Sequence, residues 1–556
     1  MRKIPAMYNR LLSLCRRACA ALSFALLSLP FASFFLLTTG VAIAEPLQAE
    51  VGTGRAALPL SLEDCISVAM KNNLDIGVEN YVPAISDADV QTQKGLFDPH
   101  IFFNATYINR VDPLSANVSV SAGGLTSVKT EQWLLSGGLT GAIATGLAYE
   151  ASISSEHTPF STITDFFEAN GEQRFTTALT VTQPLLKNFG VDVNTTGIRA
   201  AEKTREASVY ELELTILTTL FDVESAYWEL VFARENLQAK MRSLELAQNL
   251  LDENRIRLEV GVIPPLAVLQ SETGVAVREE EVIVARSQVE DAEDQLIRVT
   301  NLLPDKFIWD LEIVPTDSPV VLPPQEYVEG REITAALTKR PELKQLLKQQ
   351  EAAELNVRFT KNQLLPALDL NASIGLMGLD DGFDSSVFSL ASLGLPLPPP
   401  PHKGIDPATD DLFSGDHLQW VLGFTFELPW GTHFERGQYK SANLQVSQID
   451  ASIRNLRQVI IQDARNALRG VGTNWERVQA TRDITQFRRE SLLAEKKKFE
   501  VGVSTAHDVL QFEDELAAAE ADELRATVDY VLSQTNLLRA TGTLLEARNV
   551  RLAVNP

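Results

Sequence analysis

The sequence has 556 residues, with 49 Lys and Arg against 73 Asp and Glu, which gives a formal net charge of −24. Residues 1–44 hold five basic residues and no acidic one, so the remaining chain has 44 basic against 73 acidic side chains, a balance of −29. Such an acidic chain is poorly suited to bind nucleic acid or anionic lipid headgroups, so we expect no nucleic-acid partner.

The N-terminus has the pattern of a secretory signal peptide. A basic start is followed by an apolar run over about residues 18–37 and by Ala42-Ile43-Ala44, which resembles a cleavage site. We therefore assign residues 1–44 as a signal peptide and expect the mature chain to begin near Glu45. A retained anchor helix is the alternative, because the run is nearly long enough to span a bilayer, but Pro30 and the Ala-x-Ala site argue against it.

Removal of the signal leaves Cys65 as the only cysteine, so the mature chain has no internal disulfide. Cys65 shares one helical face with Leu62, Ile66 and Ala69. This spacing predicts a buried packing thiol rather than a reactive one.

Residues 45–301 are predicted to form a first structural repeat. After a leader over 45–60, the apolar spacing predicts a helix over 61–95, and alternating segments predict strands between about 97 and 184. Residues 131–155 form a further segment in which apolar residues alternate with others. Neither Gly nor Pro occurs from Ile198 to Val260, and these 63 residues at about 1.5 Å each make a helix of roughly 95 Å. We expect long hairpin helices over 193–301.

The same order of elements follows a proline-rich linker or equatorial region at 302–330. The second repeat, at 331–545, is predicted to have a helix to about residue 363, strands over about 364–429, and long hairpin helices over 435–542, before a C-terminal tail at 546–556. A loop is expected over 378–416.

The two repeats have nearly the same amino-acid sequence where each long helix ends. One reads Glu259-Val260-Gly261-Val262 and the other Glu500-Val501-Gly502-Val503, and a Leu-Gln pair follows at the same spacing in both. Such a repeated order indicates internal duplication. Each copy is predicted to be the tip of a helical hairpin.

The last predicted strand separates two kinds of side chain. Small or polar residues alternate with an apolar row: Trp420, Leu422, Phe424, Phe426 and Leu428. This pattern is typical of a lipid-facing surface backed by a watery lumen, and also of a sandwich strand with one buried face. Only four to six strands are visible, too few for one chain to close a water-filled barrel, so a barrel would need several chains.

Taken in order, the duplicated elements, the Gln183-Pro184 and Leu428-Pro429 strand ends and the two tips resemble the TolC-like outer-membrane efflux protein family over residues 61–545. The resemblance implies an α+β membrane protein of the cell outer membrane that extends into the periplasm. It implies a homotrimer in which each chain gives four strands to a 12-stranded transmembrane β-barrel, continued by a 12-helix periplasmic α-barrel. An equatorial belt would come from 302–330 and the C-terminal residues.

The resemblance also implies a gate just beyond the second tip. It assigns Asp508 to an acidic ring, whereas a second acidic position one turn later is Gln511 here. Phe499 keeps an aromatic position before the tip, and Ser504 stands where some members have a gating Arg. The alternative for Asp508 is a solvated acid in a first helical turn, favoured by the helix dipole.

Gly261, Val262, Gly502 and Val503 would form the tips at which a periplasmic adaptor docks. The implied function is an outer-membrane exit channel of a tripartite efflux or type I secretion system, passively conducting cargo from the adaptor and an inner-membrane transporter. Drugs, metals and polypeptides all remain possible cargo. The alternative is a structural coiled-coil protein of the periplasm or surface.

Nothing in the sequence indicates an enzyme, a metal site or a cofactor. The six histidines are scattered and never spaced as i, i+4 metal ligands. The sequence has neither a phosphate-binding Gly-rich loop nor a Gly-x-Ser-x-Gly elbow.

Overall fold

The computed structural model describes residues 56–114, 126–161, 172–302, 311–321, 323–324, 326–380 and 405–550. The predicted signal peptide lies outside the described residues. Residues 57–556 form one compact unit, and the following description concerns that unit.

Where one helix was expected over 61–95, the structure has three: α2 (Leu62–Asn72), α3 (Leu74–Glu79) and α4 (Tyr81–Lys94). The break lies at Asn73, whose side chain accepts a hydrogen bond from the Ile76 N–H and donates one to the Val299 carbonyl. An Asn that caps the following helix competes with helix continuation. Cys65 is fully buried on α2, which confirms the packing interpretation, and burial raises the pKa of its thiol to about 12.

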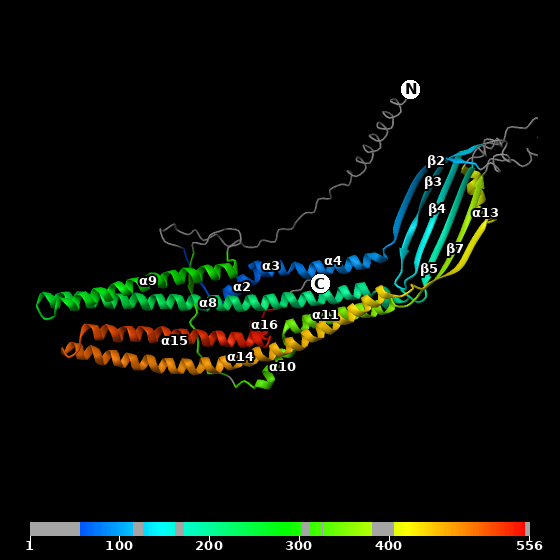
Figure 1. Cartoon of the computed structure of the whole chain (residues 1–556). Helices are drawn as coiled ribbons and strands as arrows, with labels where there is room; N and C mark the ends of the chain where they lie inside the picture. The colour runs from blue at the N-terminus through cyan, green and yellow to red at the C-terminus, as the bar shows by residue number, and fades with distance from the viewer. Residues whose placement is uncertain are drawn as a thin grey trace, which may run out of the picture. The chain divides into compact units, whose positions relative to one another are not determined.

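Four long helices form two hairpins. The first pairs α8 (Thr196–Glu259) with α9 (Pro265–Thr300), and the second pairs α14 (His433–Glu500) with α15 (Ala506–Ala540). The two helices of each hairpin run side by side, and α15 also packs on α8 (Figure 1). With 68 residues, α14 is about 100 Å long at 1.5 Å per residue.

The segment predicted as a linker contains β6 (Leu311–Pro315), which pairs with β1 (Ala56–Leu60) in a two-stranded sheet. Asp317 fixes this sheet to the helices: its carboxylate accepts hydrogen bonds from the Leu62 N–H at 2.7 Å and the Tyr227 hydroxyl at 3.0 Å. Ile313 and Tyr227 are fully buried in the largest apolar cluster of the helices. The end of the expected leader therefore forms strand β1, which pairs with strand β6 in the expected linker.

After this sheet come α10 (Glu329–Lys339) and α11 (Pro341–Asn362), which pack on α14. Short helices α7 (Val191–Asn194) and α16 (Leu544–Ala547) lie before α8 and after α15. Part of the expected loop at 378–416 is helical, as α13 (Ile405–Ser414).

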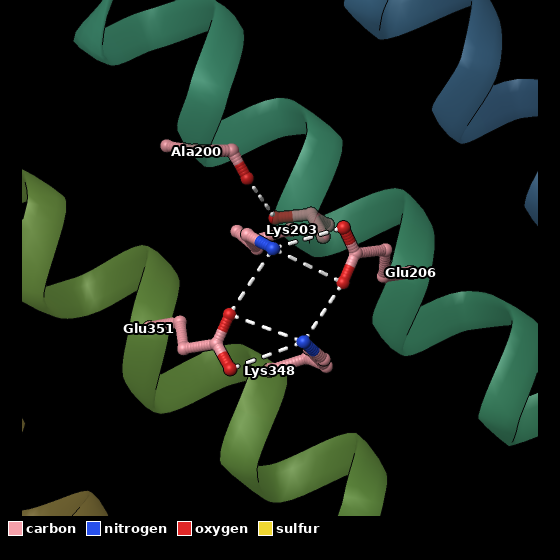
Figure 2. Close-up of polar contacts among 6 residues, drawn as sticks. Ala200, Lys203, Glu206, Lys348 and Glu351 are labelled. Atoms are coloured by element: carbon pink, nitrogen blue, oxygen red, sulfur yellow. Dashed lines mark hydrogen bonds and ion pairs between the residues drawn. The ribbon is translucent and has the colours of Figure 1, made fainter.

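Figure 2 shows how α8 of the first repeat is tied to α11 of the second. Lys203 and Glu206 lie on α8, and Lys348 and Glu351 lie on α11. Each lysine pairs with both glutamates, so the four side chains form a closed square of ion pairs with N–O distances of 2.9 to 3.2 Å. The hydrogen bonds that the two lysines donate to the two carboxylates raise the pKa of both lysines. Partial burial alone would raise the pKa of both carboxyls, but the lysine hydrogen bonds outweigh it and lower both.

The larger sheet has six antiparallel strands in the order β2-β3-β4-β5-β7-β8. Its members are β2 (His100–Pro113), β3 (Ser127–Ala142), β4 (Ala148–Ser161), β5 (Glu172–Pro184), β7 (Ala367–Asp380) and β8 (Leu418–Glu427). The implied count of four strands per chain is therefore wrong. The segment 131–155, in which apolar residues alternate with others, forms most of a β3–β4 hairpin. This hairpin lies within the sheet, between β2 and β5.

The register of the sheet gathers apolar side chains on one face, because directly paired residues point to the same side. The aligned apolar positions are Ile101, Phe103 and Tyr107 of β2, Trp133, Leu135 and Leu139 of β3, Tyr149 and Ile153 of β4, Leu179 and Val181 of β5, Leu368, Leu370 and Ile374 of β7, and Trp420, Leu422, Phe424 and Phe426 of β8.

The opposite face is polar, and its side chains bond across the strands. Hydrogen bonds join Asn104 to Ser136, Gln132 to Glu156, Thr182 to Asn371, and Asn371 to Thr425. The apolar row of β7 from Leu368 to Leu376 covers about 26 Å at about 3.3 Å per residue, close to the height of the apolar band of a transmembrane barrel.

Candidate functional site

The two hairpin tips have the same backbone geometry. Gly261 and Gly502 adopt positive φ angles of 75° and 79°, which favour glycine. In each tip the glycine N–H bonds to the carbonyl three residues earlier, and the next N–H, of Val262 or Val503, bonds to the carbonyl five residues earlier. This is the Schellman motif, so the repeated Gly-Val sequence ends the long helix in each repeat.

The valines of the two tips are exposed apolar side chains. Val262 is 72% exposed and Val503 73% exposed. The tips diverge immediately afterwards: Pro264 precedes α9, which begins at Pro265, whereas the Thr505 side chain caps α15.

The Asp508 carboxylate takes part in a capping box at the start of α15. It accepts hydrogen bonds from the Thr505 hydroxyl at 2.7 Å and the Thr505 N–H at 3.1 Å, while the Asp508 N–H donates to Thr505 Oγ1 at 3.2 Å. These bonds, the hydroxyl bond foremost, lower the pKa of Asp508 below its usual value. The side chain is therefore ionised and held in place at the helix N-terminus.

Ser504, which stands where the resemblance has a gating Arg, bonds within its own tip. Its hydroxyl donates to Glu495, which also pairs with Lys498 at 2.8 Å. These contacts, that of Lys498 foremost, lower the pKa of Glu495. Sequence comparison of the tips misses Glu495 because it lies nine residues before Ser504, on the preceding helix.

Phe499 connects the second tip to the first. The Arg257 guanidinium lies 4.5 Å from the centre of the Phe499 ring, a cation–π contact between the ends of α8 and α14. Arg257 also pairs with Glu253 one turn earlier. Gln511 is exposed, and its side-chain amide donates to Glu515 at 3.1 Å, so an acidic group lies one turn beyond Gln511.

A second contact between the hairpins lies further along α9 and α15. Arg278 is only 3% exposed and donates to the Ser243 hydroxyl at 3.1 Å, the Gly274 carbonyl at 3.0 Å and the Asp514 carboxylate. The buried positions of α9 follow a spacing of three and four residues, and Arg278 occupies one of them. A charged residue at a buried position of a long helix is a sequence signal for a contact between helices. Comparison of the two tip sequences does not detect it, because Arg278 lies outside the tips.

The structure aligns the predicted lipid-facing residues of β8. Trp420, Leu422, Phe424 and Phe426 point to the apolar face of the sheet, and each is more than half exposed. Leu428 lies just past the end of β8 and is also exposed. The site residues thus fall into two groups, one in the sheet and one at the tips.

In the part of the chain that the structure describes, no helix combines the length and apolarity needed to cross a membrane. Across the same residues, no three His, Cys, Asp or Glu side chains gather as metal ligands.

The chain matches the family model described as outer membrane efflux protein over residues 146–302 and 333–543. It is 23% identical over 331 residues to the outer membrane protein TolC of Escherichia coli strain K12, covering 59% of this chain and 62% of TolC, which is under two thirds of that relative. It is 23% identical over 369 residues to the outer membrane efflux protein BepC of Brucella suis biovar 1 strain 1330, covering 66% of this chain and 72% of BepC.

The fold is similar to the crystal structure of the Campylobacter jejuni CmeC outer membrane channel, with a TM-score of 0.59 and 16% identity over 87% of this chain and 86% of CmeC. Channel proteins rather than enzymes make up this family. The chain belongs to the outer membrane efflux protein family and is a protein of the cell outer membrane that extends into the periplasm.

Proposed function

We propose that this chain is the outer-membrane exit channel of a tripartite efflux or type I secretion system. The observation that carries the proposal is a sheet with one apolar and one polar face whose strands lead into two long hairpins with matched tips. An apolar face suits lipid, and a polar face suits a watery lumen. The channel conducts passively and catalyses no reaction.

The functional unit is a homotrimer. The edge strands β2 and β8 of each sheet offer unpaired backbone groups, which lipid does not tolerate, so neighbouring copies must cover them. Four long helices from each of three copies then supply a 12-helix periplasmic tunnel. An equatorial belt forms around residues 302–330 and the C-terminal residues.

The partners act at the tips and at the sheet. Val262 and Val503, with Gly261 and Gly502 shaping the turns, form exposed apolar tips that bind a periplasmic adaptor. The adaptor links the channel to an inner-membrane transporter. Outer-membrane lipid covers the apolar face of the sheet, including Trp420.

The gate lies at the second tip. Three copies of Asp508 form an anionic ring that favours cations, and Phe499, Ser504 and Gln511 adjoin it. The contact of Ser504 with Glu495 fixes the shape of the second tip, and the contact of Phe499 with Arg257 holds the two tips of a chain together.

Fractionation of cells that produce the full chain tests the proposal. The mature chain, beginning near residue 45, is expected in the outer membrane as a trimer that resists heat in detergent. Recovery of the mature chain as a soluble periplasmic protein would reject the channel and support a structural coiled-coil protein instead.

A further inference from the structure

We infer that the β3–β4 hairpin widens the membrane wall, so that three copies of this chain close an 18-stranded barrel. The inference rests on the proposed trimeric channel. It concerns the width of the exit rather than its existence.

The first support is the position of the hairpin within the sheet. All 14 residues of β2 pair with β3, and β4 pairs with β5 from Ala148 to Thr158. β2 and β5 are therefore separated by two full strands. A hairpin attached to the outside of a four-stranded sheet would leave β2 paired with β5.

The second support is that the hairpin has one apolar and one polar face, as the rest of the sheet does. Trp133, Leu139 and Ile153 continue the apolar face, and Trp133 packs on Tyr107 of β2 with ring centres 4.8 Å apart. Gln132 bonds to Glu156 on the polar face. A surface excursion bathed in water on both sides has no need of this alternation.

The third support is the anchoring of the hairpin turn. The Thr145 carbonyl accepts a hydrogen bond from the Gly190 N–H at 3.1 Å, in the segment that joins β5 to α8. Gly146 has a φ of 93°, and a Cβ there would lie 2.4 Å from the Asn188 carbonyl oxygen. The turn is thus fitted to the base of the sheet, where β5 leads into the helices.

Strand direction permits closure. Six antiparallel strands place β2 and β8 in opposite directions, so β8 of one copy meets β2 of the next in the antiparallel sense. Strands about 4.8 Å apart and tilted about 40° give a backbone diameter of about 36 Å for 18 strands and about 24 Å for 12.

The wider barrel fits the proposed helical tunnel. Twelve helices with axes about 9 Å apart form a ring about 35 Å across. An 18-stranded barrel therefore continues the tunnel without narrowing, so the membrane segment admits whatever the open tunnel admits.

Removal of residues 127–161 tests the inference, because β2 and β5 are antiparallel and their apolar rows are in phase. Electron cryomicroscopy of wild-type trimers in nanodiscs is expected to show 18 strands, and trimers of the deletion variant 12. In planar bilayers, the largest polyethylene glycol that enters from the barrel side should be at least about one and a half times wider for the wild type, because lumen side chains narrow both barrels by the same depth. The matched control, Trp133→Phe, should retain the wild-type cut-off. Twelve strands in the wild type, or equal cut-offs, would overturn the inference.

A second measurement does not depend on the deletion variant folding. Single cysteines at Ser152 and Ser154 face the polar side, and those at Ala151 and Ile153 the apolar side. A water-soluble thiol reagent should label the first pair at least tenfold faster, with native Cys65 buried. Equal labelling of all four in a conducting trimer would reject the hairpin as wall and leave the proposed channel intact. Absence of trimers and of conductance would reject the channel itself.

Discussion

Arg278 on α9 and Asp514 on α15 form an ion pair across the two repeats, with the guanidinium buried and the carboxylate largely exposed. Arg278 also bonds to Ser243 and Gly274, so its position is fixed by the first hairpin alone. Asp514 is the group that joins the second hairpin to it. The pair therefore tethers the hairpins near their tips without being needed for either hairpin to fold.

Asp514→Asn should loosen this tether. The substitution keeps the shape of the side chain and removes the charge that pairs with Arg278, so separation of the tips costs less free energy. We expect the open probability in planar bilayers to rise several-fold. Asp522→Asn, an exposed position on the same helix, is the matched control and should leave gating unchanged. Identical gating of the two variants would show that the pair does not hold the tips.

Asp508→Asn should reduce cation selectivity and weaken block by multivalent cations severalfold, if three carboxylates line the gate. Because Thr505 holds the pKa of Asp508 below its usual value, the charge is present at neutral pH and is lost only as pH falls through that lowered pKa. Selectivity should therefore persist through the range where ordinary aspartates become protonated.

Thr505→Ala separates the two roles of Asp508. It removes the helix cap but keeps the carboxylate, so it should fray the start of α15 while preserving selectivity. Loss of selectivity in both variants would assign Asp508 a capping role only.

Val262→Asp and Val503→Asp should weaken binding to the purified adaptor by about tenfold or more each, because a buried valine contributes about 1.5–3 kcal/mol and a charge in its place must be desolvated. Both side chains are exposed in the chain, so trimer formation should not change in either variant. Conductance should not change in Val262→Asp, which lies outside the proposed gate. Surface plasmon resonance measures the affinity. Glu259→Gln, beside the first tip, is the control, and unchanged affinity in both valine variants would remove the tips from the docking surface.

Glu351→Gln should weaken the contact between α8 and α11. Since Glu351 is nearly half exposed, solvent screening limits the loss to about 0.3–1 kcal/mol in the free energy of unfolding. Urea denaturation measures it, with the exposed Glu354→Gln as control. An equal effect of both substitutions would mean that the ion pairs contribute nothing specific.

The pH dependence of this contact has two limits. The lowered pKa values of Glu206 and Glu351 mean that their contribution is present above the usual glutamate pKa and lost as pH falls through the lowered values. The raised pKa of Lys203 means that its contribution is complete below the usual lysine pKa and lost as pH rises through the raised value. Stability of wild type relative to Glu351→Gln should therefore be flat around neutral pH and decline at both extremes.

Local signals in the sequence identified the features that depend on neighbouring residues. Gly261 and Gly502 stop their helices through backbone geometry, and Trp420 reveals its face through alternation along one strand. Family resemblance located Asp508, but only the structure shows that Thr505 binds its carboxylate.

Features that depend on distant partners leave no local signal in the sequence. The pairing of β1 with β6 joins segments about 250 residues apart, and neither segment is recognisable as a strand alone. The contact between Arg278 and Asp514 likewise spans the two repeats. An alternation of apolar and polar residues predicts the strands of the β3–β4 hairpin, but only their pairing with β2 and β5 places them inside the sheet.

Single-channel recording of the mature chain, purified from outer membranes and reconstituted in planar bilayers, tests the channel most directly. The account predicts discrete, cation-selective conductance steps from heat-resistant trimers, with selectivity reduced by Asp508→Asn. Trimers that insert but never conduct, or a mature chain that does not insert at all, would contradict it.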